Sequence, residues 1–147
     1  FKQKTAYEIM PSLVGSEMCI RDRAYVGRAM ACAEQGDFDA AQADLNSALD
    51  IAPYDPVALN GQAWFYAWYR RDHLAEAEQL AQRAVAGARD DLERARCLDT
   101  LGWVYYRQGR YEEAATTLEE AAGLATIEGD VVYSEIAEHL EEVRMAQ

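Results

Sequence analysis

The side chains that could act in catalysis or bind a metal are few and scattered along this chain of 147 residues. There are two histidines, His73 and His139, and three cysteines, Cys19, Cys32 and Cys97. None of them stands at metal-ligand spacing, and no phosphate-binding glycine loop or nucleophile elbow is present. We expect both histidines to lie at the surface, and Cys32 and Cys97 to be small buried residues. The sequence therefore predicts neither an enzyme nor a cofactor or metal site.

Charged residues narrow the choice of partner. An acidic cluster at Asp90, Asp91 and Glu93 suggests weak cation binding, but acidic groups at a helix start complement the helix dipole, which is the favoured interpretation. The formal net charge of −12 is opposite to the basic surface that nucleic acid requires, so we expect no nucleic-acid partner. Apolar residues are spread along the chain without a run long enough for a membrane span.

The elements that would hold a binding site are clearest between residues 98 and 121. Apolar or small residues at i, i+3, i+4 and i+7 predict a helix, Gly109 supplies the left-handed turn that ends it, and helical spacing then resumes. The two facing stripes are Leu98, Leu101, Gly102 and Tyr105 before the turn, and Ala114, Leu118 and Ala121 after it. Gly102 is predicted to sit where the helices approach too closely for a side chain.

This hairpin resembles a tetratricopeptide repeat (TPR), whose pattern of Leu-Gly, Tyr, Gly, Tyr, Ala, a large apolar residue and Ala it matches almost fully. One hairpin cannot bury its own apolar face, so further copies are expected. The residues equivalent to Gly102 are Ala29, Ala63 and Glu141, at spacings of 34, 39 and 39 residues. In the second copy the turn glycine is absent, and residues 70–73 predict a longer turn.

The resemblance implies an all-α fold, namely a short TPR solenoid of three helical hairpins plus a C-terminal capping helix. Glu141 at the close-packing position indicates that no further hairpin stacks there. The expected TPR domain covers residues 24–147, with repeats at about 24–55, 56–89 and 91–128 and a capping helix at about 130–146.

Residues 1–23 differ from the rest of the chain. Both lysines lie here, and residues 4–23 resemble a translated sequencing-adapter string found at the ends of metagenome-derived sequences. We expect a non-native leader with little structure, because Pro11 and Gly15 interrupt a long helix. The alternative is a genuine leader or linker. On the first interpretation the true N-terminus is missing and no targeting signal can be read. The location of the protein is then unknown, with a weak preference for the cytoplasm. The composition suggests a GC-rich bacterial source.

The TPR resemblance also implies a peptide-binding groove, lined by residues of each first helix that lie off the core face. Helical spacing supports the grouping, because Trp64 and Trp68 are i, i+4, while Asp99, Trp103 and Tyr106 are i, i+4, i+7. The alternative is that these rings fill gaps between helices. The predicted groove residues are Asn60, Trp64, Trp68, Arg96, Asp99, Trp103, Tyr106 and Arg107, with Val26, Met30, Ala33 and Glu34 from the first repeat.

The predicted function is a non-catalytic protein–protein interaction module that binds a partner peptide or helix in the concave groove. Aromatic residues beside arginines are typical of binding hot spots, and they favour a segment with apolar anchors and acidic groups. Val26 and Met30 replace the Lys and Asn of the carboxylate clamp, so binding of chaperone C-termini is not expected. The alternative function is a structural spacer from a longer, N-terminally truncated TPR scaffold.

Overall fold

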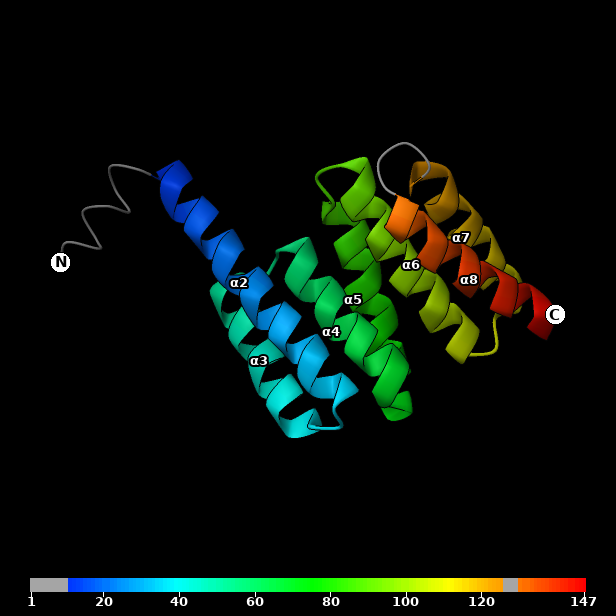
Figure 1. Ribbon diagram of the computed structural model, residues 1–147, viewed down its shortest axis with the longest axis horizontal. Coiled ribbons are helices and arrows are strands. Elements are labelled where there is room, and N and C mark those ends of the chain that lie inside the picture. The colour runs from blue at the N-terminus through cyan, green and yellow to red at the C-terminus, as the bar shows by residue number, and fades with distance from the viewer. Residues whose placement is uncertain (1–10, 126–129) are drawn as a thin grey trace.

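The protein is a row of antiparallel helical hairpins closed by a single helix. The computed structural model describes residues 11–125 and 130–147, and within these ranges there are helices and no strands, which confirms the all-α class. The helices follow one another from one end of the molecule to the other (Figure 1). They are α2 (Pro11–Glu34), α3 (Phe38–Ile51), α4 (Pro56–Tyr69), the 3-10 helix η1 (Arg71–His73), α5 (Leu74–Gly87), α6 (Asp91–Arg107), α7 (Tyr111–Ala125) and α8 (Asp130–Ala146).

Two of the three hairpin turns depend on glycine. Gly36 and Gly109 have φ angles of 86° and 82°, in the left-handed region that other residues avoid, and this confirms the turn predicted at Gly109. In the second hairpin η1 occupies the place of the glycine turn, which agrees with the longer turn expected there.

The two helices of each hairpin pack through small residues. A Cβ atom built on Gly102 of α6 would lie 2.6 Å from Leu118 Cγ of α7, so this site has no room for a side chain. The predicted close approach is therefore confirmed. The facing residues of the second helices are all buried: Ala41, Leu45 and Ala48 on α3, Ala77, Ala81 and Ala84 on α5, and Ala114, Leu118 and Ala121 on α7.

Helix α2 corrects the expectation of little structure for the leader. It runs without a break from Pro11 through Gly15 and past residue 23, and the side chain of Asp22 is fully buried. Proline is tolerated in the first turn of a helix, and one glycine inside a helix costs only about 1 kcal/mol. Residues 1–10 lie outside the described ranges, and the non-native origin of residues 1–23 stays a prediction.

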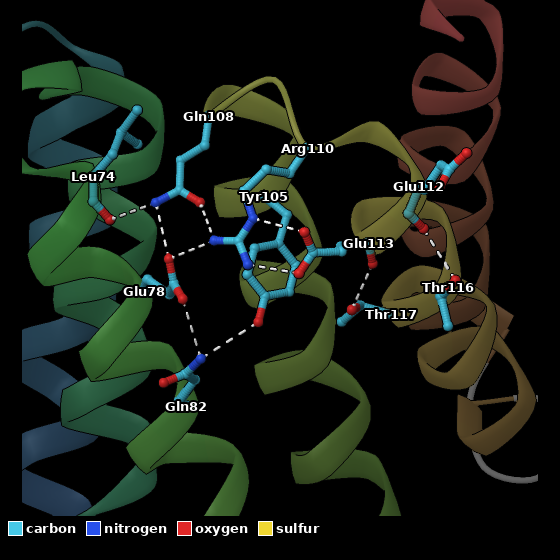
Figure 2. A network of polar contacts seen from close by, with 10 residues as sticks. All are labelled: Leu74, Glu78, Gln82, Tyr105, Gln108, Arg110, Glu112, Glu113, Thr116 and Thr117. Carbon is cyan, nitrogen blue, oxygen red and sulfur yellow. Dashed lines mark hydrogen bonds and ion pairs between the residues drawn. The ribbon is translucent and has the colours of Figure 1, made fainter.

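A polar network sets the position of the third hairpin against the second. Gln108, after the end of α6, donates hydrogen bonds to Leu74 O (3.4 Å) and Glu78 Oε1 (3.0 Å) of α5. Arg110 donates to the same Glu78 oxygen at 2.8 Å and also binds Glu113 (Figure 2). Its guanidinium lies 4.4 Å from the centre of the Tyr105 ring. Because these contacts join α5, α6 and α7, they restrict the angle between neighbouring hairpins.

The last helix packs on the third hairpin with one apolar stripe. Val132, Ile136, Leu140 and Val143 of α8 are buried in the same cluster as Ala114 and Leu118 of α7, while Glu141 is exposed. Within the described residues, none of the helices combines the length and the apolar character that a membrane crossing needs.

Candidate functional site

The predicted groove residues divide between two places on the first helices of the hairpins. Asn60 and Arg96, together with Val26 and Met30, line a hollow between α2, α4 and α6. The tryptophans, Asp99 and Tyr106 gather further along α4 and α6, toward the C-terminal ends of these helices.

The aromatic half is a packed stack of rings. The Trp68 and Trp103 rings lie 4.7 Å apart at an angle of 18°, and Trp103 also lies 4.7 Å from Tyr106. Trp64 continues the cluster on α4, 6.4 Å from Trp68. Trp103 is only 3% exposed, whereas Trp64, Trp68 and Tyr106 are half-buried. The expectation that Trp103 lines an open groove is therefore wrong, because rings of neighbouring helices cover it; for this residue the gap-filling alternative holds.

Helix α8 closes this half of the inner face. The His139 ring lies 4.8 Å from Trp103 and 5.9 Å from Trp68, and its Nδ1 is 2.7 Å from Asp99 Oδ1. The Tyr106 hydroxyl lies 3.5 Å from Glu142 Oε1. His139 was expected at the surface, and the structure corrects this, because its side chain packs against α6. The signal was present in the sequence, since His139 follows Ile136 by three residues and therefore borders the buried stripe of α8.

The ionisation of His139 depends on its neighbours across this contact. Burial is the largest single influence and lowers the pKa of the imidazole. The hydrogen bond and charge of Asp99, with the charges of Glu135 and Glu142, act in the opposite direction and outweigh burial, so the pKa of His139 is raised. A protonated His139 makes an ion pair with Asp99, which joins α8 to α6.

The other half is an open hollow of about 400 Å³, formed by the first helices of all three hairpins and the residue that precedes α6. The Asn60 Oδ1 atom is buried and accepts no hydrogen bond from the described residues. Arg96 is exposed, and its guanidinium makes no ion pair within the same part of the chain. The lining residues are Arg23, Val26, Gly27, Met30, Val57, Asn60, Asp90, Leu92, Glu93, Arg96 and Cys97.

The acidic residues at the edge of this hollow already have partners. Asp90 caps α6 by accepting a hydrogen bond from the Glu93 backbone at 2.7 Å. The Glu93 carboxylate binds Arg89 at 2.9 Å and approaches Arg23 at 3.5 Å. In the described ranges no three His, Cys, Asp or Glu residues are grouped as a metal site would require. The helix-start interpretation of this cluster therefore fits the contacts.

Cys97, at the floor of the hollow, is an unreactive thiol. Burial, followed by the charges of Glu93 and Asp55, raises the pKa of this thiol to about 12, so it stays protonated at neutral pH. It contributes a small apolar surface to the wall, as expected from the sequence.

Comparison with known proteins identifies the class. Family models described as tetratricopeptide repeat match residues 67–126 and 22–55, together more than half of the chain, which therefore belongs to the TPR family. No curated protein sequence matches.

Two solved structures share the fold. The first TPR domain of the human RPAP3 protein is 21% identical, covers 86% of this chain and 98% of its own, and has a TM-score of 0.61. The N-terminal domain of stress-induced protein-1 (STI-1) from C. elegans is 19% identical, with 83% and 96% covered and a TM-score of 0.57. At these identities the likeness concerns the fold alone.

Proposed function

We propose that this TPR protein-interaction module binds an extended partner segment in the hollow between α2, α4 and α6. The hollow lies on the face of the molecule that the first helices of the hairpins form. Its volume of about 400 Å³ is at the lower end of the range typical of ligand sites. Such a space admits one or two apolar side chains of a peptide.

One observation supports this location above all: the buried Asn60 Oδ1 atom has no donor. A buried acceptor that lacks a hydrogen bond is costly, typically by about 1–3 kcal/mol. A main-chain N–H of a bound segment would satisfy it, while the apolar wall of Val26, Met30 and Val57 would receive a neighbouring side chain.

The charges around the hollow favour an acidic segment over a basic one. Glu93 and Asp90 are already engaged, so they offer little attraction to a cationic ligand. Arg96 remains available for a carboxylate of the partner. We therefore still expect a partner segment with apolar anchors beside acidic groups. We now expect it to bind in this hollow and not at the tryptophan stack.

The test is a peptide-display selection against the whole protein, followed by binding to two variants. Val57→Trp fills the hollow, whereas Val131→Trp adds the same side chain at an exposed position of α8. Peptides enriched on the parent protein should lose binding to Val57→Trp and keep it with Val131→Trp. Equal binding to both variants would contradict the location. A selection that enriches no peptide would favour the spacer alternative.

A further inference from the structure

The junction between α2 and α4 holds a buried carboxyl group without a hydrogen-bond donor. The Asp22 side chain on α2 is fully buried, and neither of its oxygens has a partner in the described part of the chain. The carboxyl group of Asp55, the residue before α4, lies beside it and also has a buried oxygen, Oδ2, without a donor. Ionisation is strongly disfavoured where burial removes water and no donor replaces it. The packed state of α2 therefore favours a protonated Asp22.

The other charged groups at this junction pair with one another and not with Asp22. Asp55 Oδ1 accepts a hydrogen bond from Arg89 at 2.8 Å, and Arg89 also binds Glu93 of α6 at 2.9 Å. Arg23, the next residue on α2, approaches Glu93 at 3.5 Å. Burial, and then the neighbouring carboxyl group of Asp55, outweigh the influence of Arg23 and raise the pKa of Asp22 to about 7.

This junction borders the hollow, so a movement of α2 changes the shape of the hollow. Arg23, Val26 and Met30 of α2 line it. Val57 of α4, two residues after Asp55, lines it as well. Helix α2 stands at the end of the helix row and packs mainly against α3 and α4 (Figure 1). An element at the end of a repeat array has neighbours on one side only, so it opens at a lower free energy than the middle of the array.

We infer that Asp22 and Asp55 form a pH-sensitive latch, in which a proton on Asp22 holds α2 against α4 and the loss of this proton loosens α2. The ionised Asp22 is repelled by Asp55 and regains water when α2 moves away. Because α2 supplies one wall of the hollow, the latch also weakens ligand binding as the pH rises. The latch itself needs no ligand, whereas its effect on binding rests on the proposed function.

The size of the effect follows from the proton that the packed state retains. When α2 opens, Asp22 returns from a pKa of about 7 to its ordinary value of 3.8. The stabilisation by the proton is therefore complete below about pH 4 and is lost as the pH rises through about 7. The opening equilibrium of α2 should accordingly be about tenfold larger at pH 8 than at pH 6.

The test is amide hydrogen exchange of the full chain at pH 6 and pH 8, followed by mass spectrometry and corrected for the intrinsic pH dependence of exchange. The parent protein is compared with Asp22→Asn. Asp50→Asn is the control, because Asp50 is an exposed carboxyl group on α3. His139 also has a raised pKa, but it lies on α8 against α6 and is the same in all three proteins.

Opening of α2 should rise about tenfold from pH 6 to pH 8 in the parent and in Asp50→Asn, and should stay nearly constant in Asp22→Asn. It should also exceed the opening of α7. The same pH response in Asp22→Asn as in the parent, or equal opening of α2 and α7, would overturn the inference. A display-selected peptide added at pH 6 should slow exchange in α2 and α4. If the latch responds as expected and no selected peptide slows this exchange, the latch stands and the proposed function fails.

Discussion

The imidazole of His139 on α8 lies 2.7 Å, Nδ1 to Oδ1, from the carboxylate of Asp99 on α6, and its ring covers the indole of Trp103. The C-terminal helix therefore does more than shield the apolar end of the third hairpin. It closes the aromatic half of the inner face, so the open part of this face is the hollow between α2, α4 and α6.

This contact makes stability depend on pH. Because the pKa of His139 is raised in the folded protein, the ion pair with Asp99 stabilises the fold fully below the unfolded pKa of about 6.5. The stabilisation is lost as the pH rises through the folded pKa. Thermal unfolding measured between pH 5 and 9 should show this loss in the parent and a smaller one in His139→Gln. Asp99→Asn is the matched variant. An identical pH profile in all three proteins would contradict the contact.

Asp22 should oppose folding at neutral and alkaline pH. Burial, and then the neighbouring carboxyl group of Asp55, raise its pKa from 3.8 to about 7. The folded protein therefore binds a proton that the unfolded chain releases, so stability falls as the pH rises from about 4 to 7. Asp22→Asn should flatten this slope and raise the unfolding midpoint at pH 8. If the slope of stability against pH were the same in Asp22→Asn and in the parent, the prediction would be wrong. Such a result would mean that this part of α2 does not pack against α4.

Gly102→Leu should destabilise the protein by about 1–3 kcal/mol, because the new side chain must displace Leu118. Leucine is the better helix former, so the sign separates packing from helix propensity. The control is Gly123→Leu on α7, where an added Cβ meets nothing within 4 Å; it should be neutral or stabilising. Denaturant titration gives both values. A neutral Gly102→Leu would refute the close approach of α6 and α7.

The two stacked tryptophans should differ in their contribution to stability. Trp103→Ala should cost about 3–5 kcal/mol, since the ring is buried among Trp68, Tyr106 and His139. Trp68→Ala should cost less, because its ring is half-exposed. Equilibrium unfolding in denaturant, followed by circular dichroism, measures both changes. Equal small losses would place both rings at the surface.

The features that the sequence predicts well are those imposed by local backbone geometry. Gly109 adopts the left-handed turn and Gly102 the close helix approach, because no other residue satisfies those requirements at low cost. The alanine stripes on α3, α5 and α7 follow from the same helical spacing. These positions are specified by neighbours within one hairpin.

The features that the sequence did not predict depend on contacts between elements. Whether Trp103 is open or covered depends on α8, whose His139 meets Asp99 across forty residues of chain. The site is likewise assembled from α2, α4 and α6, so the donor-free Asn60 Oδ1 atom appears only in three dimensions. The helix α2 was not predicted because Pro11 and Gly15 were expected to interrupt it. An internal glycine such as Gly15 destabilises a helix too little to end it.

The position of a bound peptide on the folded protein tests the proposed binding site between α2, α4 and α6 most directly. A peptide enriched by display would be titrated into isotope-labelled protein, and backbone amide shifts would be followed by NMR. We expect the largest shifts around Met30, Asn60 and Arg96, and small ones on the outer helices α3, α5 and α7. Shifts concentrated on those outer helices, with the lining of the hollow unchanged, would contradict it.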